Sequence, residues 1–83
     1  MNISITHPTD RPNFSIVTLG ARSVAFSYDT PIGFKLYPYH RWTTRVNDWG
    51  PTTGKHLNYL NDDTDRLDSD EFESRLAAFY EGA

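Results

Sequence analysis

The fold is decided at residues 49–60, which read WGPTTGKHLNYL and join two halves of different character. Apolar and polar side chains alternate before this stretch, as in β-strands, and helical spacing follows it. Within the stretch, two threonines can serve as helix N-caps, and Leu57 and Leu60 share one face three positions apart. We therefore expect a short helix over 52–61, with Thr52 or Thr53 as its N-cap and both leucines facing a sheet.

Several strand-like segments precede this stretch. Residues 14–19 are rich in β-branched side chains, and residues 3–6 form a short candidate edge strand. Alternation with a period of two then recurs over 23–28, 32–36 and 41–46. Gly, Pro, Asn and Asp separate successive segments and favour tight turns. The pattern predicts an antiparallel meander of three or four strands.

A longer helix is predicted over 69–81. Asp68 and Glu71 fit the two ends of a capping box, and Leu67 and Phe72 fit a hydrophobic staple around it. The apolar stripe of this helix consists of Phe72, Leu76, Phe79 and Tyr80. We expect a single α+β domain over residues 1–83, with both helices packed on one face of the sheet.

The composition excludes several classes of protein. The chain has no cysteine, so neither disulfides nor thiolate metal sites can stabilise it, and its five Phe, five Tyr and two Trp must supply much of the core. No apolar run approaches the length of a transmembrane helix, and the first residues lack the pattern of a signal peptide. These features predict a soluble, intracellular protein.

The net charge of −3 hides an uneven distribution. Residues 35–56 are mostly basic, whereas residues 61–73 carry seven acids against one arginine. One interpretation is internal complementarity together with a solvated acidic loop. The alternatives are a basic surface for a phosphate-bearing partner or an acidic surface for a basic protein.

Known chemical motifs are matched only in part. Residues 50–56 resemble a phosphate loop, but three residues separate the glycines and His56 follows the lysine, where a P-loop needs four residues and Ser or Thr. Residues 61–71 resemble a calcium loop but lack its central glycine and are one residue short. The three histidines have no zinc-binding spacing, and no nucleophile has a recognisable context. We expect no metal, no cofactor and no enzymatic activity.

Two stretches resemble a known group of sequences. Residues 27–34 read SYDTPIGF, and residues 49–58 read WGPTTGKHLN. Together they resemble a family of short uncharacterised bacteriophage proteins, which have a strand ending in Ser-Tyr-x-Thr-Pro-Ile-x-Phe and then Trp-x-x-Thr-Thr-x-x-His-Leu-Asn. The resemblance implies an α+β fold and a phage context, and therefore a location in the cytoplasm of an infected bacterium.

These observations favour a non-enzymatic interaction protein that binds, and so inhibits, a host or phage macromolecule such as a CRISPR effector or a polymerase. A protein or nucleoprotein partner is expected, and no membrane. The predicted contact residues are Tyr39, Arg41, Trp49, Thr52, Thr53, Lys55 and His56. The alternative is a protein that binds single-stranded nucleic acid through residues 35–45, where aromatic and basic side chains interleave.

Overall fold

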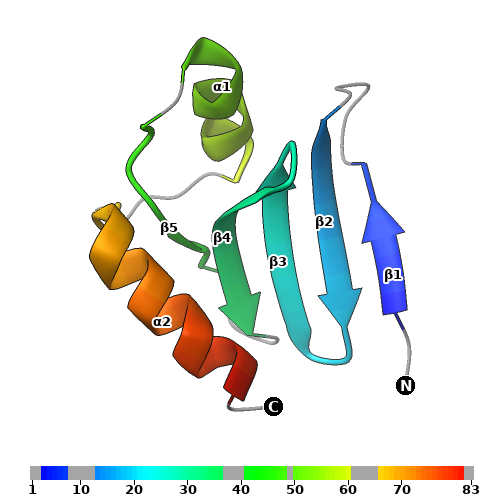
Figure 1. Ribbon diagram of the computed structural model, residues 1–83. Coiled ribbons are helices and arrows are strands. Elements are labelled where there is room, and N and C mark those ends of the chain that lie inside the picture. Colours follow the sequence, from blue (N-terminus) through cyan, green and yellow to red (C-terminus); the bar gives the residue numbers. More distant parts are fainter. Residues whose placement is uncertain (1–2, 8–12, 37–40, 49, 61–65, 82–83) are drawn as a thin grey trace.

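In a computed structural model, which describes residues 3–7, 13–36, 41–48, 50–60 and 66–81, the chain forms an antiparallel sheet and two helices (Figure 1). The strands are β1 (Ile3–Thr6), β2 (Phe14–Leu19), β3 (Arg22–Ser27), β4 (Thr30–Leu36) and β5 (Thr43–Thr44), and the helices are α1 (Pro51–Tyr59) and α2 (Ser69–Glu81). The predicted α+β class is therefore confirmed. Neither of these helices is long and apolar enough to cross a membrane.

The sheet is a meander in which each strand pairs with its neighbours in sequence, in the order β1-β2-β3-β4-β5. It has five strands rather than the three or four expected, because the candidate edge segment pairs along its whole length with β2. The segment expected as a strand over 41–46 keeps sheet pairing only at Thr43 and Thr44. Its next residues turn to the segment before α2, where Val46 N donates to Leu67 O over 2.8 Å.

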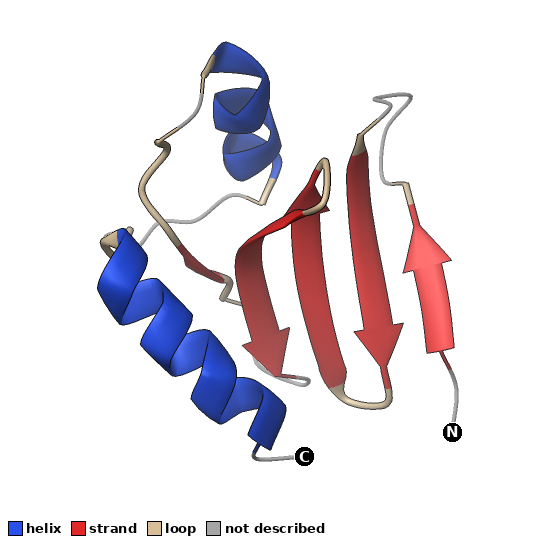
Figure 2. Ribbon diagram, in the orientation of Figure 1, coloured by secondary structure: helices blue, strands red, loops and turns tan. Residues whose placement is uncertain are grey.

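The two helices lie on opposite faces of the sheet, so the expectation of one shared face was wrong. Successive residues of a strand point to opposite faces. On β3, Ala25 packs in the cluster that contains Leu57 and Leu60 of α1, whereas Val24 packs in the cluster that contains Phe72 and Leu76 of α2. The sheet, red in Figure 2, therefore lies between the two helices, which are blue.

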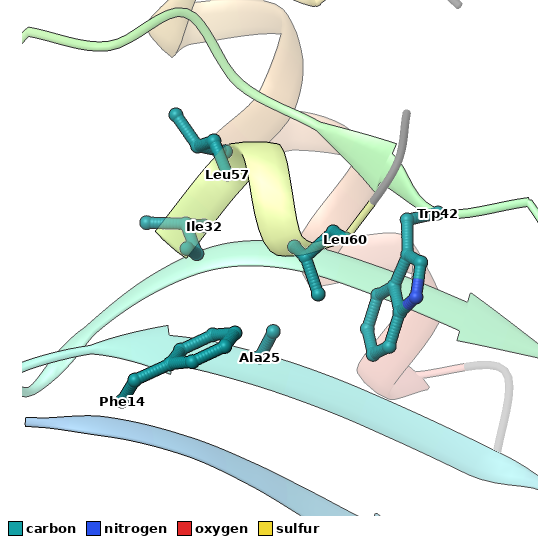
Figure 3. Close-up of a cluster of buried hydrophobic side chains, with 6 residues drawn as sticks. All are labelled: Phe14, Ala25, Ile32, Trp42, Leu57 and Leu60. Atoms are coloured by element: carbon teal, nitrogen blue, oxygen red, sulfur yellow. The ribbon is translucent and has the colours of Figure 1, made fainter. Parts of the chain in front are cut away.

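The reason for this error lies in the small residues of β3. Ser23, Ala25 and Ser27 suggested an outward face, yet all three are buried. Their small size leaves room for the side chains of α1 to approach the sheet. Figure 3 shows Leu60 extending from α1 toward Ala25, and Leu57 packs in the same buried cluster, which confirms that both leucines face the sheet.

Helix α1 begins differently from the prediction. Gly50 occupies the N-cap position, Pro51 begins the helix, and no side chain caps it. Proline suits the first helical position because its missing N–H would have no helical partner there and its φ is already helical. The expectation that Thr52 or Thr53 is the N-cap was therefore wrong.

Helix α2 agrees with its predicted range and start. Glu71 N donates to Asp68 Oδ1 over 2.8 Å, which confirms Asp68 as the N-cap. The Glu71 carboxylate accepts a hydrogen bond from Arg75 Nε at 2.9 Å, one turn further along the helix. Leu67 packs against the cluster of Phe72, as a hydrophobic staple requires.

Gly33 of β4 allows α1 to approach the sheet closely. A Cβ atom at this position would lie 3.0 Å from Leu60 Cδ1 and 3.2 Å from Thr44 Cγ2. Both neighbours are buried, so neither can move freely away. The absence of a side chain at residue 33 therefore sets the spacing between β4, β5 and the end of α1.

We predict that Gly33→Ala lowers the free energy of unfolding by about 1–3 kcal/mol, because the new methyl group overpacks this contact. Urea denaturation followed by circular dichroism measures the change. The matched control is Gly50→Ser, since a Cβ at Gly50 meets nothing within 4 Å. Equal stability of Gly33→Ala and the wild type would show that the contact can relax.

Candidate interaction surface

A buried polar network joins α1 to the sheet. Ser27 Oγ at the end of β3 lies 2.9 Å from Thr53 Oγ1 and 2.8 Å from His56 Nδ1, and all three side chains are buried. Buried polar groups are costly unless they are hydrogen-bonded. The network therefore holds α1 in one position, since a shift of the helix would break both bonds.

The imidazole ring is also part of the aromatic core. His56 stacks on Phe14 of β2, with ring centroids 4.6 Å apart and an interplanar angle of 7°. Tyr59 meets the same phenyl ring edge-on at 5.3 Å. Phe14 thus receives two side chains of α1, one turn apart, and fixes the rotation of the helix over β2.

This network corrects part of the predicted contact surface. Thr53 and His56 were expected among the accessible residues, but they are only 4% and 1% exposed. Their polar atoms bond to Ser27 inside the protein and are not presented to a partner. The prediction that Thr53 and His56 contact a partner was wrong, because Ser27, to which both bond, lies 26 to 29 residues away in the sequence.

The geometry of Ser27 and His56 invites comparison with a nucleophile and its general base, which also lie within hydrogen-bonding distance. A catalytic serine must meet its substrate, however. Ser27 is 2% exposed and His56 is 1% exposed, so a substrate has no access to either group. The contact therefore suits a structural role.

The outward side of α1 carries the residues that a partner can reach. Thr52, Lys55 and Tyr59 are exposed, and their spacing of i, i+3 and i+7 places them on one side of the helix. Next to them, Asn58 Oδ1 accepts a hydrogen bond from Arg66 at 3.2 Å. The helix therefore presents a hydroxyl, an ammonium group and a phenol along one exposed stripe.

Tyr28 lies near this stripe, in the turn between β3 and β4. Its ring centroid is 6.5 Å from that of His56, and the residue is 55% exposed. Its φ of 59° is uncommon for a bulky residue, and the hydrogen bond from Tyr28 N to Asn13 O, at 2.6 Å, helps to hold it. Tyr28 and Tyr59 thus flank the buried pair of Phe14 and His56. We name the exposed set Tyr28, Thr52, Lys55 and Tyr59 the α1 surface.

The two tyrosines were not among the predicted contact residues. The signal for Tyr59 was present, since it continues the spacing of Thr52 and Lys55 along the helix. No local pattern indicated Tyr28, because its position depends on the fold. Of the other predicted residues, Arg41 is exposed, whereas Tyr39 and Trp49 lie outside the described residues.

The basic and aromatic stretch over 35–45 is partly used for folding. Trp42 is buried, and Lys35 Nζ lies 4.8 Å from the centre of its ring. Arg45 is buried as well, with its guanidinium 5.2 Å from the centre of the Phe72 ring. Side chains that pack in this way are not available to stack on bases or to contact phosphates. Residues 37–40, which carry other aromatics of this stretch, lie outside the described residues.

Arg45 instead docks α2 against the rest of the fold. Its Nη1 donates to Glu73 Oε1 over 2.7 Å, and its Nη2 donates to Ser69 Oγ over 2.8 Å. Ser69 Oγ in turn donates to Asp48 Oδ2 over 2.6 Å. Part of the opposite charge noted in the sequence is thus neutralised internally, as the first interpretation of the charge pattern supposed.

Within the described ranges, no group of three or more histidines and acids is arranged to hold a metal ion. The acids at 61–65, which suggested the calcium comparison, lie outside those ranges.

The two stretches that carry the phage resemblance meet in space. Ser27 of the first bonds to Thr53 and His56 of the second, and Ile32 of the first packs in the same cluster as Leu57 of the second. Much of both stretches therefore builds the contact between the sheet and α1. Thr52 and Lys55 are the members of the second stretch that face outward.

We compared the sequence with known protein families, curated proteins and solved structures. The sequence matches a family of unknown function (DUF8033) over residues 4–74. No curated protein and no solved structure matches the chain.

We predict that Ser27→Ala lowers the free energy of unfolding by about 1–3 kcal/mol, because it removes the hydroxyl that Thr53 and His56 share while hardly changing the volume. Thermal and urea denaturation provide the measurement. Thr52→Ala, one residue from Thr53 but exposed, is the control and should stay within about 0.5 kcal/mol of the wild type. A Ser27→Ala protein as stable as the control would contradict the structural role of the network.

Proposed function

The chain belongs to this family of unknown function, and we propose that it is a small non-enzymatic interaction protein that binds a partner macromolecule through the α1 surface. The protein inhibits that partner by occupying one of the partner's functional surfaces. Because the sequence resembles bacteriophage proteins, we take the partner to be a host or phage macromolecule in the bacterial cytoplasm, such as a CRISPR effector or a polymerase.

The observation that carries this proposal is the division of α1 into two sides. Its inner side is held by the hydrogen bonds of Ser27 and by the stacking of His56 on Phe14. Its outer side exposes Thr52, Lys55 and Tyr59. A rigid helix loses little conformational entropy when a partner binds, and such pre-organisation favours affinity.

The chemistry of the α1 surface supports a macromolecular partner with an acidic or phosphate-bearing patch. Tyrosine is enriched at the energetic centres of protein interfaces, since it offers a large apolar area and a hydroxyl with few rotatable bonds. Tyr28 and Tyr59 are 55% and 46% exposed, which leaves much of both rings open to contact. Lys55, and Arg66 beside Asn58, supply positive charge next to them.

Binding of single-stranded nucleic acid through 35–45 is less well supported. Trp42 and Arg45 are buried and Lys35 packs on the Trp42 ring, so these three side chains contribute to folding. This alternative enters the experiment below as one of its outcomes.

We predict that Lys55→Glu lowers partner affinity about tenfold or more, because it reverses a charge at the centre of the surface. The protein is immobilised, incubated with bacterial lysate with and without nuclease, and the retained proteins are identified by mass spectrometry. Affinity is then measured with the purified partner. Lys55 is tested without His56, since replacing the buried imidazole would disturb the fold.

The matched control is Arg75→Glu, which makes the same charge change on an exposed residue of α2, on the opposite face of the sheet. This variant should bind as the wild type does. Equal binding of Lys55→Glu and the wild type would exclude the α1 surface. Loss of all capture after nuclease treatment, with tryptophan quenching by an oligonucleotide, would favour the nucleic-acid alternative instead.

A further inference from the structure

One half of the sheet carries apolar side chains that neither helix covers. The register pairs Ile3 with Leu19 and Ile5 with Val17, so these four residues share a face of β1 and β2. Val17 also pairs with Val24, which packs against α2, so this is the face on which α2 lies. Ile3 and Ile5 are 66% and 62% exposed. We name this face of β1 and β2 the open strip.

The opposite face of the same two strands is different. On β1 it carries Ser4 and Thr6, which are exposed, whereas on β2 it carries Phe14 and Ile16, which pack in the cluster of α1. Alternation of apolar and polar residues along a strand is typical of a sheet with one covered face. β1 therefore has the pattern of a strand whose Ile3 and Ile5 face is covered, although the described residues leave this face open.

A hollow of about 220 Å³ continues this strip toward α2. Val17 and Leu19 line it on the sheet side, and Phe79 and Tyr80 line it on the helix side. Burial, reinforced by the charge of Glu73, raises the pKa of the Tyr80 hydroxyl. The hollow and the open strip together form one continuous apolar surface.

The open strip has the width of one helix. Figure 1 shows α2 beside β4, away from β1 and β2, and no other described helix lies on this face. Strands lie about 4.8 Å apart, so two strands span roughly 10 Å. The diameter of an α-helix with its side chains is about 10–12 Å. A single additional helix would complete this layer.

We propose that the open strip is the interface of a symmetric homodimer, in which α2 of each copy lies on β1 and β2 of the other. A two-fold axis that runs along the strands between the two sheets achieves this, because it carries α2 from the covered half of one sheet to the open half of its partner. The two copies of α2 then lie side by side between two sheets.

The outer side of α2 fits the open strip. Phe72 and Leu76 face the chain's own sheet. The opposite side of the helix exposes the small residues Ser74, Ala77 and Ala78 along its middle, and the acidic residues Asp70 and Glu81 near its two ends. Small residues let a helix approach closely, and the large side chains of Ile3, Ile5 and Leu19 would fill the space beside them. The large side chains of the open strip would thus contact the small side chains of α2 from the other copy. The two-fold symmetry makes this contact twice.

The charges are complementary as well. Arg22 pairs with Leu19 where β2 turns into β3, and its guanidinium is 5.6 Å from the centre of the Phe79 ring near the C-terminal end of α2. An axis along the strands brings the C-terminal end of the second α2 to the same end of the sheet. That end carries the negative pole of the helix dipole and Glu81, with no basic residue in its last turn. Arg22 of each copy would therefore face an acidic helix end.

The area is small for a dimer. A helix of 13 residues is about 20 Å long, so its footprint on two strands is roughly 200 Å². The symmetry makes two such contacts, each formed by the strip of one copy and the helix of the other. Each copy thus contributes roughly 400 Å², about half of the 800 Å² that a stable interface buries from each partner. We therefore expect a dimer that dissociates in the micromolar range.

Sedimentation equilibrium of the full chain tests the proposal, from low micromolar to near-millimolar concentration. The mass of the wild type should rise from 9.5 kDa toward twice that value. Ala78→Arg should raise the dissociation constant of the dimer at least tenfold, because the long side chain blocks the contact. Arginine has a high helix propensity, so α2 itself should remain folded. The matched control is Thr52→Arg, which adds the same charge on the other face of the sheet and should leave dimerisation unchanged.

A second variant tests the open strip itself. Ile3→Thr keeps a β-branched residue in β1 but removes apolar area, and it should weaken the dimer several-fold with an unchanged circular dichroism spectrum. A wild type that stays monomeric at all concentrations overturns the proposal. A dimer that survives both variants at wild-type strength also overturns it and would indicate pairing elsewhere, such as along the free edge of β1. The α1 surface lies on the other face, so these outcomes are independent of partner binding.

Discussion

The architecture depends on the hydroxyl of Ser27, which meets Thr53 and His56 inside the protein. A helix as short as α1 is unstable in isolation, because few hydrogen bonds offset the cost of nucleation. Docking on the sheet provides the missing stability, and the polar network restricts the docking to one position. A purely apolar contact would tolerate rotation of the helix, whereas a satisfied buried network rigidifies and specifies a single arrangement.

This constraint links folding to the proposed function. The side of α1 that packs on the sheet contains Thr53, His56 and Leu57. The exposed side contains Thr52, Lys55 and Tyr59. Because the rotation of the helix is fixed, the exposed stripe has a defined position relative to Tyr28 in the neighbouring turn. The same short segment therefore serves both purposes, and substitutions on its two sides have different consequences.

The position of the helices on opposite faces separates two surfaces of different chemistry. The α1 surface is aromatic and positively charged, as expected of a contact with a charged macromolecule. The open strip beside α2 is apolar, as expected of a contact that excludes water. A dimer formed through the strip leaves both copies of α1 on its outer sides. Such a dimer would present two binding surfaces, and simultaneous engagement of both would raise the apparent affinity without any new contact.

Much of the fold could be predicted from the sequence, for local reasons. Helix α2 is confirmed from Ser69 to Glu81, because its cap at Asp68 and its staple depend on residues only a few positions apart. The strands β2, β3 and β4 follow from alternation and turn residues in the same way. The absence of cysteine and the density of aromatic residues correctly indicated a core built on large side chains.

The tertiary structure decided what depends on distant pairs. The sequence placed Thr53 and His56 beside Thr52 and Lys55, and all four had the same apparent suitability for binding. Only the meeting of β3 with α1, across 26 to 29 residues, buries the first pair and leaves the second exposed. The same holds for the helices: alternation identifies the two faces of β3, but only packing shows which helix covers each. Local patterns determine the type of each element and where it begins and ends. Burial depends on residues distant in the sequence, which come together only when the chain folds.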